Sequence, residues 1–192
     1  MPEVRWIRKR YSAGKDRRKP VSPSGIDPGG QWTLRRAQPA DVGAVARVTD
    51  VVYRKYVPLL GRAPKPMTAD HAGMITDDLV WLLLRDGEPV GVLELVQEPE
   101  CMLIYSVAIC SGFQGHGLGR SLLDWAERQA VQDGNQRMRL YTNALMTSNI
   151  ALYRGLGYEE TAREPYLGST LVHMSKRLHD GEAQDGTRRA GR

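Results

Sequence analysis

A glycine-rich stretch, Gln114-Gly115-His116-Gly117-Leu118-Gly119, contains the residues whose types and spacing are best suited to binding a ligand. It precedes a segment with helical apolar spacing, and the first turn of a helix presents unpaired N–H groups and the positive end of the helix dipole. Phosphate oxygens bind well at such a site. The glycines allow the backbone to approach a phosphate because they carry no Cβ, and Arg120 adds a cation. The stretch therefore predicts a phosphate-binding loop.

Two well-known phosphate loops do not fit these residues. A Walker A loop needs Gly-Lys-Ser/Thr, and the dinucleotide fingerprint G-x-G-x-x-G needs a glycine where Arg120 stands. The dinucleotide fingerprint also follows the first strand of a parallel βαβ unit, whereas we expect antiparallel strands before this loop. From these residues alone, a tight strand-to-helix connection that binds nothing stays open as an alternative.

Three strand-like apolar runs come before the loop, at residues 80–84, 90–96 and 102–109. Asp86-Gly87 between the first two is the turn signal of a tight β-hairpin. Because the runs follow one another closely, we expect neighbouring strands to pair in antiparallel fashion.

Earlier in the chain, the pattern predicts a short strand at residues 32–35 and a helix with apolar spacing over residues 42–56. A polar, Pro-rich stretch follows at residues 61–67, and Thr68 or Asp70 could then cap a second short helix. We expect a substrate loop in this Pro-rich stretch.

After the glycine loop, Leu118 begins a helix that Gly134 can end in the left-handed conformation. A strand at residues 138–142, a short helix at residues 149–154 and a strand at residues 171–174 complete the pattern. This order of elements predicts a single α/β (α+β) domain with a mixed sheet.

Composition and charge divide the chain into three parts. Its 192 residues, 41% hydrophobic and 26% charged, suit one globular domain. Residues 1 to 20 hold eight Lys or Arg against two acids, a net charge of +6, so the rest of the chain sums to −1. We expect a flexible basic N-terminal extension over 1–31, a folded domain over 32–180 and a disordered tail over 181–192. The folded domain is therefore not expected to offer a basic surface to nucleic acid.

The remaining composition limits the class of protein. No apolar run reaches 18 residues and the N-terminus lacks a signal-peptide pattern, which predicts a cytoplasmic protein without membrane contact. The two cysteines, Cys101 and Cys110, and the four histidines show no ligand spacing, so we expect neither a disulfide nor a bound metal.

The glycine loop resembles the signature of the GNAT superfamily of acetyl-CoA-dependent N-acetyltransferases, Gln/Arg-x-x-Gly-x-Gly/Ala. Gln114, Gly117 and Gly119 fall on it. The resemblance extends to a second conserved region and covers roughly residues 33 to 178. The stretches similar to that second region are Leu140-Tyr141-Thr142-Asn143, Asn149-Ile150-Ala151-Leu152-Tyr153 and Leu156-Gly157-Tyr158.

The resemblance implies a single domain with a mixed, mostly antiparallel sheet of about six to seven strands, flanked by helices and splayed at the acetyl-CoA site. It also implies that backbone groups on the strand before the loop pair with the pantetheine arm of the cofactor. The residues that it assigns to acetyl-CoA are Val107, Ala108, Ile109, Gln114, Gly115, His116, Gly117, Leu118, Gly119, Arg120, Asn149 and Tyr153.

Tyr153 matches the superfamily's general-acid tyrosine, which protonates the CoA thiolate as it leaves. Spacing alone fits a core aromatic as well, because Ile150 and Leu156 share its helix face. The resemblance favours the catalytic interpretation.

The general base is less clearly marked. A lysine-like amine has a pKa of about 10.4 and must lose a proton before it attacks. Glu94 alternates to the face opposite Leu93 and Leu95; it could point into the substrate cleft or outward into solvent. Many superfamily members have a carboxylate on the strand before the loop, which this sequence lacks. Tyr105, Tyr141 or water are alternative proton carriers, and Tyr56, Tyr105 and Tyr141 are expected to line the acceptor site.

Taken together, the resemblance implies transfer of an acetyl group from acetyl-CoA to a primary amine. The absence of an acidic cluster near the loop favours a small-molecule acceptor over a protein lysine or N-terminal amine. A different class, a non-catalytic CoA-binding module whose basic tail touches nucleic acid through Trp6 and Tyr11, is the remaining alternative. A monomer and a homodimer are both compatible with the sequence.

Overall fold

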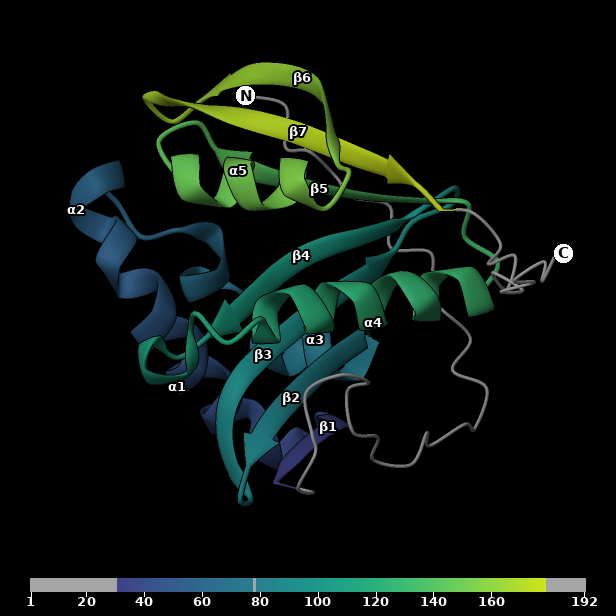
Figure 1. Ribbon diagram of the computed structural model, residues 1–192. Coiled ribbons are helices and arrows are strands. Elements are labelled where there is room, and N and C mark those ends of the chain that lie inside the picture. Colours follow the sequence, from purple (N-terminus) through teal and green to yellow (C-terminus); the bar gives the residue numbers. More distant parts are fainter. Residues whose placement is uncertain (1–30, 78, 179–192) are drawn as a thin grey trace, which may run out of the picture.

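A computed structural model of the protein describes residues 31–77 and 79–178, which form one seven-stranded mixed sheet with helices on both faces (Figure 1). The strand order is β1-β2-β3-β4-β5-β7-β6, and only β4 and β5 pair in parallel. The expected fold class is confirmed, while residues 1–30 and the tail 181–192 lie outside the described residues. The strands are β1 (Trp32–Arg36), β2 (Leu79–Arg85), β3 (Glu88–Gln97), β4 (Met102–Ile109), β5 (Arg137–Asn143), β6 (Glu159–Tyr166) and β7 (Ser169–Arg177).

The helices lie between these strands. The longer helices are α1 (Val42–Tyr53), α3 (His71–Asp77), α4 (Leu118–Gln132) and α5 (Thr147–Gly155), with the single turn α2 (Val57–Leu60) after α1. Short 3-10 turns, at Pro39–Asp41, Arg54–Tyr56, Lys65–Thr68 and Ser111–Phe113, connect these elements.

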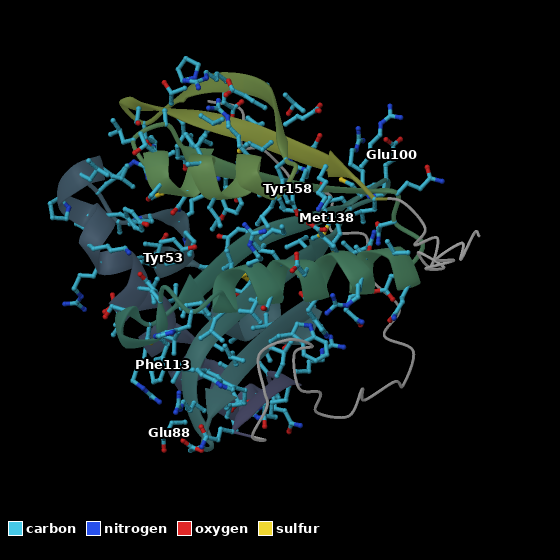
Figure 2. The ribbon with its side chains drawn as sticks, viewed as in Figure 1. Tyr53, Glu88, Glu100, Phe113, Met138 and Tyr158 are labelled. Carbon is cyan, nitrogen blue, oxygen red and sulfur yellow. The ribbon has the colours of Figure 1, made fainter. Side chains whose placement is uncertain are left out.

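Each face of the sheet has its own hydrophobic core because side chains alternate along the strands. In β2, Val80 and Leu82 belong to the core beneath α1 and α3, whereas Trp81 and Leu83 belong to the core on the other face, where Trp81 packs against Trp125 of α4. A strand that is buried on both faces reads as a continuous apolar run, as residues 80–84 do. In Figure 2 the interior residues Met138 and Tyr158 lie between β5 and α4, whereas Glu88 and Glu100 lie at the rim.

Local sequence signals set several of the boundaries. Asp86 and Gly87 have φ angles of 52° and 87°, and two successive positive φ values form the hairpin turn that best matches strand twist. The Asp70 carboxylate accepts a hydrogen bond from the Gly73 backbone N–H at 3.0 Å at the start of α3. Gly134 ends α4 with a φ of 80°. The predicted hairpin and the predicted ends of these helices are confirmed.

The sheet opens between its two parallel strands. β4 and β5 pair only where Met102, Leu103 and Ile104 oppose residues 138–140. Beyond Ile104, β4 continues to Ile109 and β5 continues to Asn143 without pairing to each other. Figure 1 shows the two strands diverging toward the side where α1 and the start of α4 lie. This is the splay that the sequence resemblance implies.

Candidate active site

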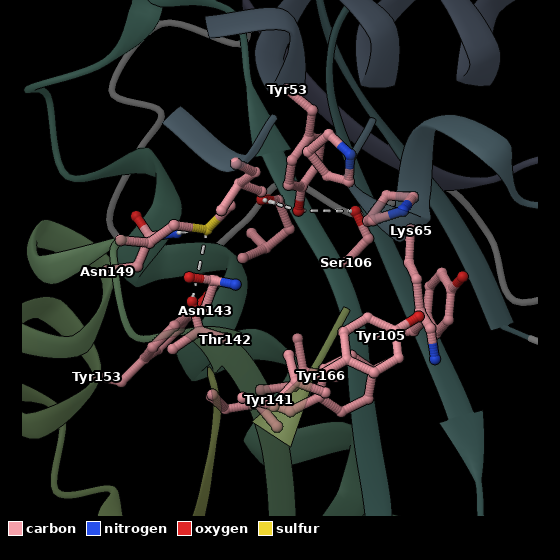
Figure 3. Close-up of a pocket in the computed structure, with 18 of the residues that line it drawn as sticks. Tyr53, Lys65, Tyr105, Ser106, Tyr141, Thr142, Asn143, Asn149, Tyr153 and Tyr166 are labelled. Carbon is pink, nitrogen blue, oxygen red and sulfur yellow. Dashed lines mark hydrogen bonds between the residues drawn. The ribbon is translucent and has the colours of Figure 1, made fainter. Parts of the chain in front are cut away.

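A pocket of about 640 Å³, part of it open to solvent, lies where β4 and β5 separate (Figure 3). Strands β4 and β5 form two walls, α5 forms a third, and the Pro-rich loop (residues 61–67) and the β6–β7 hairpin complete it. The lining residues are Tyr53, Leu60, Arg62, Pro64, Lys65, Pro66, Ile104, Tyr105, Ser106, Val107, Leu140, Tyr141, Thr142, Asn143, Met146, Asn149, Tyr153, Tyr166 and Leu171.

The open edge of β4 presents backbone groups to the gap. Cys110 N–H donates to the Val90 carbonyl of β3 at 2.9 Å. Because successive residues of a strand direct their backbone groups to opposite sides, Ala108 also faces β3, while Val107 and Ile109 face the gap. No other strand of the described residues pairs with them there. Of the three residues expected beside pantetheine, Val107 and Ile109 therefore present free-edge N–H groups, whereas Ala108 is buried beneath α1.

The carbonyls on this edge already have partners. The Ile109 carbonyl accepts a hydrogen bond from the Gln114 side-chain amide at 2.6 Å, which ties the glycine loop to the end of β4. The Val107 carbonyl accepts a longer one, 3.4 Å, from the Tyr53 hydroxyl. The Gln114 amide is thus committed to β4, so its expected contribution would be to position the loop.

The glycine loop opens α4 in the way that phosphate binding requires. Gly115 and Gly117 have φ angles of 84° and 77°, in the left-handed region that other residues adopt only with strain. Apart from the glycine itself, its chain neighbours and the backbone of its own helix, no atom of the described residues lies within 4 Å of where a Cβ would stand on Gly115, Gly117 or Gly119. His116 and Arg120 are exposed, whereas the Leu118 side chain is buried in the core, leaving only its backbone available to a ligand.

Helix α5 brings Asn149 and Tyr153 to the pocket. The Asn149 side-chain oxygen accepts a hydrogen bond from the Tyr56 hydroxyl at 3.3 Å. Tyr56 thus lies behind Asn149, outside the lining of the pocket, whereas Tyr105 and Tyr141 line it.

Tyr153 is 8% exposed, and its ring packs edge-on against Tyr158 with ring centroids 6.1 Å apart. Burial, supplemented by the charges of nearby tyrosines, raises the pKa of the Tyr153 hydroxyl above its ordinary value. Within the described residues, no protein group forms a hydrogen bond with this hydroxyl. Tyr153 therefore holds a proton, facing the pocket, that it can give to a ligand.

Glu94 does not line the pocket but lies directly beside Ser106, which does. It is 0% exposed on the sheet face covered by α1 and α3, and its Oε1 lies 3.1 Å from His71 Nδ1. Its other oxygen, Oε2, has no partner among the described residues. The alternative of a solvated, outward carboxylate is wrong, and Glu94 is also absent from the pocket lining. Ser106, its direct neighbour on β4, separates it from the gap.

Several lining residues lie outside the predicted set. The Tyr53 hydroxyl shares a hydrogen bond with the Ser106 hydroxyl at 3.2 Å, and burial raises the pKa of Tyr53. Arg62, Lys65 and Tyr166 gather at the mouth of the pocket, where both cations lie over the Tyr166 ring. The Pro-rich composition around Lys65 is the one local signal that indicated this loop.

Two further properties bear on the class of protein. Across residues 31–77 and 79–178, no three His, Cys, Asp or Glu side chains are arranged to hold a metal ion. No helix in the same part of the chain is both long enough and apolar enough to cross a membrane.

Comparison with known proteins adds a family and a set of similar folds. Residues 49–158 match the model of the acetyltransferase (GNAT) family. No curated protein sequence matches the chain significantly. A PaiA N-acetyltransferase from Thermoplasma acidophilum, solved in complex with coenzyme A, is 17% identical with a TM-score of 0.65, over 76% of this chain and 98% of that one.

Two other solved structures are similarly related. The yncA protein of Salmonella typhimurium, with its cofactor acetyl-CoA, is 22% identical with a TM-score of 0.60, covering 81% of this chain and 99% of that one. The ribosomal-protein-S18-alanine N-acetyltransferase of Escherichia coli is 18% identical with a TM-score of 0.62, covering 79% and 97%. At such identities, these likenesses establish the fold.

Proposed function

Since this chain belongs to the acetyltransferase (GNAT) family and is therefore an acetyl-CoA-dependent N-acetyltransferase, we propose that it acetylates the primary amine of a small molecule. The observation that supports a small acceptor is the cover over the pocket. Arg62 and Lys65 of the Pro-rich loop lie 4.9 and 5.0 Å from the Tyr166 ring centroid of the β6–β7 hairpin. The loop and the hairpin therefore meet above the pocket and narrow its opening.

The residues around the gap fit acetyl-CoA. The free-edge N–H groups of Val107 and Ile109 suit the amide carbonyls of its pantetheine arm, because an unpaired backbone group needs a partner. The first turn of α4, with Gly115, Gly117 and Arg120, suits its pyrophosphate. Asn149, at the pocket end of α5, would complete the cofactor side. The cofactor supplies the acetyl group as a reactive thioester.

The protein's own residues then handle the protons. As the amine nitrogen bonds to the acetyl carbon and the carbon–sulfur bond breaks, the departing thiolate takes a proton, which we assign to Tyr153. The raised pKa of Tyr153 keeps that proton in place at neutral pH until the thiolate forms. No carboxylate belongs to the described lining, so the proton lost by the amine would leave through water or the tyrosines of the pocket.

Acetyl-CoA binding and thiol release provide the test. Calorimetry with acetyl-CoA should show binding, and a panel of small amines and short peptides should show CoA release only where acetylation occurs. Turnover of peptides alone would refute the small acceptor and favour a protein amine. Binding without turnover of any amine would favour the non-catalytic CoA-binding module; its nucleic-acid part concerns a basic tail outside the described residues.

A further inference from the structure

The pocket has an unbalanced charge. Among its described lining residues, Arg62 and Lys65 are cationic and none is acidic. Neither forms an ion pair in the described part of the chain. Lys65 Nζ instead lies 5.7 Å from the Tyr141 ring centroid and 5.0 Å from that of Tyr166. Aromatic faces hold these cations in place without neutralising their charge.

Two buried donors of the same lining lack partners. Within the described residues, Arg62 Nε and Asn143 Nδ2 are both out of reach of solvent and make no hydrogen bond. The Asn143 amide is held in place, since its oxygen accepts bonds from Leu145 N–H at 3.0 Å and the Ser169 hydroxyl at 2.9 Å. A buried donor without an acceptor is destabilising, and both donors belong to residues that line the pocket.

The cations lie on the acceptor side of the pocket rather than on the cofactor side. In Figure 3, Asn149 and Tyr153 of α5 lie on one side, and Lys65 and Tyr166 lie on the other. The glycine loop, where the cofactor's phosphates are expected, does not contribute to the lining. The unmatched positive charge is therefore available to the molecule that receives the acetyl group.

We propose that the acceptor amine also carries an anionic oxygen group, of the carboxylate or phosphonate kind, and that Arg62, Lys65 and Asn143 recognise that group. The inference rests on the proposed function and names its substrate class. Guanidinium and amide N–H groups suit the acceptor oxygens of such an anion. Nearby positive charge also lowers the pKa of an amine. The same two cations would thus help to keep the nucleophile neutral where the pocket has no carboxylate base.

The test compares amines in matched pairs that differ only in the anionic group: 4-aminobutyrate against butylamine, and L-amino acids against their amides. A third arm, 3-aminopropylphosphonate, distinguishes a phosphonate from a carboxylate. We expect kcat/KM to be about tenfold to a hundredfold higher for the anionic member of each pair, the range of a charge-assisted hydrogen bond. An amide's amine is less basic than that of its amino acid, so amine protonation would bias the second pair in the opposite direction.

Point variants test which residues cause the preference for an anionic acceptor. Arg62→Gln and Lys65→Gln should each raise KM for the anionic acceptor about tenfold more than KM for butylamine, while leaving acetyl-CoA affinity within about twofold. Arg47→Gln, the same change at an exposed arginine of α1 outside the pocket, is the matched control. Lys65→Glu should reverse the preference within the first pair.

The possible outcomes distinguish failure of the anionic-acceptor proposal from failure of the proposed function. Equal turnover of both members of every pair, or variants no different from Arg47→Gln, would overturn the anionic acceptor and leave N-acetylation of a small amine intact. Absence of turnover with every amine, charged or not, despite acetyl-CoA binding, would overturn both.

Discussion

Replacing Tyr153 by Phe removes one hydroxyl and leaves the rest of the pocket unchanged. That hydroxyl has no protein partner among the described residues, so little stability should be lost, and the ring can still pack against Tyr158. If Tyr153 is the acid that protonates the thiolate, kcat should fall by about a hundredfold to a thousandfold, which lies within the range of general acid catalysis. This corresponds to about 3 to 4 kcal/mol in the activation barrier.

The assay is thiol release under acetyl-CoA saturation, together with calorimetry of acetyl-CoA binding. The affinity for acetyl-CoA should change less than about twofold, because the Tyr153 proton is assigned to the departing thiolate rather than to the intact thioester. Tyr158→Phe is the matched control: it alters the other ring of the pair, whose hydroxyl contacts the Met138 sulfur at 3.8 Å and is buried outside the pocket. Because burial raises the Tyr153 pKa, the wild-type rate should also show no alkaline decline through loss of this proton below about pH 10. Unchanged kcat in Tyr153→Phe, or an equal loss in Tyr158→Phe, would refute the assignment.

Two further predictions concern the phosphate loop and a surface ion pair. Gly117→Ala should weaken acetyl-CoA binding about tenfold. The control Gly134→Ala introduces a similar backbone strain of about 1 kcal/mol, at a φ of 80°, at the other end of α4, so it should lower stability without weakening acetyl-CoA binding. Equal losses of binding in the two variants would contradict a phosphate site at Gly117. Arg35 donates to both carboxylate oxygens of Asp41, at 2.7 and 2.8 Å, and lowers its pKa. A carboxyl group whose pKa is lower in the folded state stabilises the protein at pH values above its unfolded pKa of about 3.9, and this stabilisation is lost as the pH falls. Urea denaturation should therefore show Asp41→Asn to be less stable than wild type by about 1 kcal/mol at neutral pH and closer to wild type at about pH 3. A difference that does not depend on pH would contradict that reasoning.

Much of the fold could be predicted from short-range signals. Asp86-Gly87 sets a hairpin whatever surrounds it, and Gly134 ends a helix for the same backbone reason. Strand β6 was not predicted, because all but the last of its residues are exposed and its apolar residues do not alternate. It forms because β7 pairs with it through a turn at Leu167-Gly168, where both φ angles are positive, 46° and 77°. That turn was the signal available in the sequence.

The residues of the candidate site also differ in how far the sequence could predict them. The glycine loop and Tyr153 lie in contiguous motifs, and it is the family resemblance of those motifs that implies their roles, because spacing alone also fits a plain connection and a core aromatic. Alternation correctly placed Glu94 on the face opposite Leu93, but it could not show that α3 brings His71 against that face. Arg62 and Tyr166 are about a hundred residues apart, and only the sheet order brings them together.

The splay between β4 and β5 also affects solubility. An unpaired strand edge normally invites a strand from another molecule and so promotes aggregation. Here the open edge lies inside the sheet, flanked by β5 and by α5, and can be reached by a slender ligand more easily than by a second polypeptide. One outer edge of the sheet, β6, instead carries exposed charged residues and has Pro165 near its end. The protein can thus keep backbone donors permanently available for its cofactor without becoming a template for self-association.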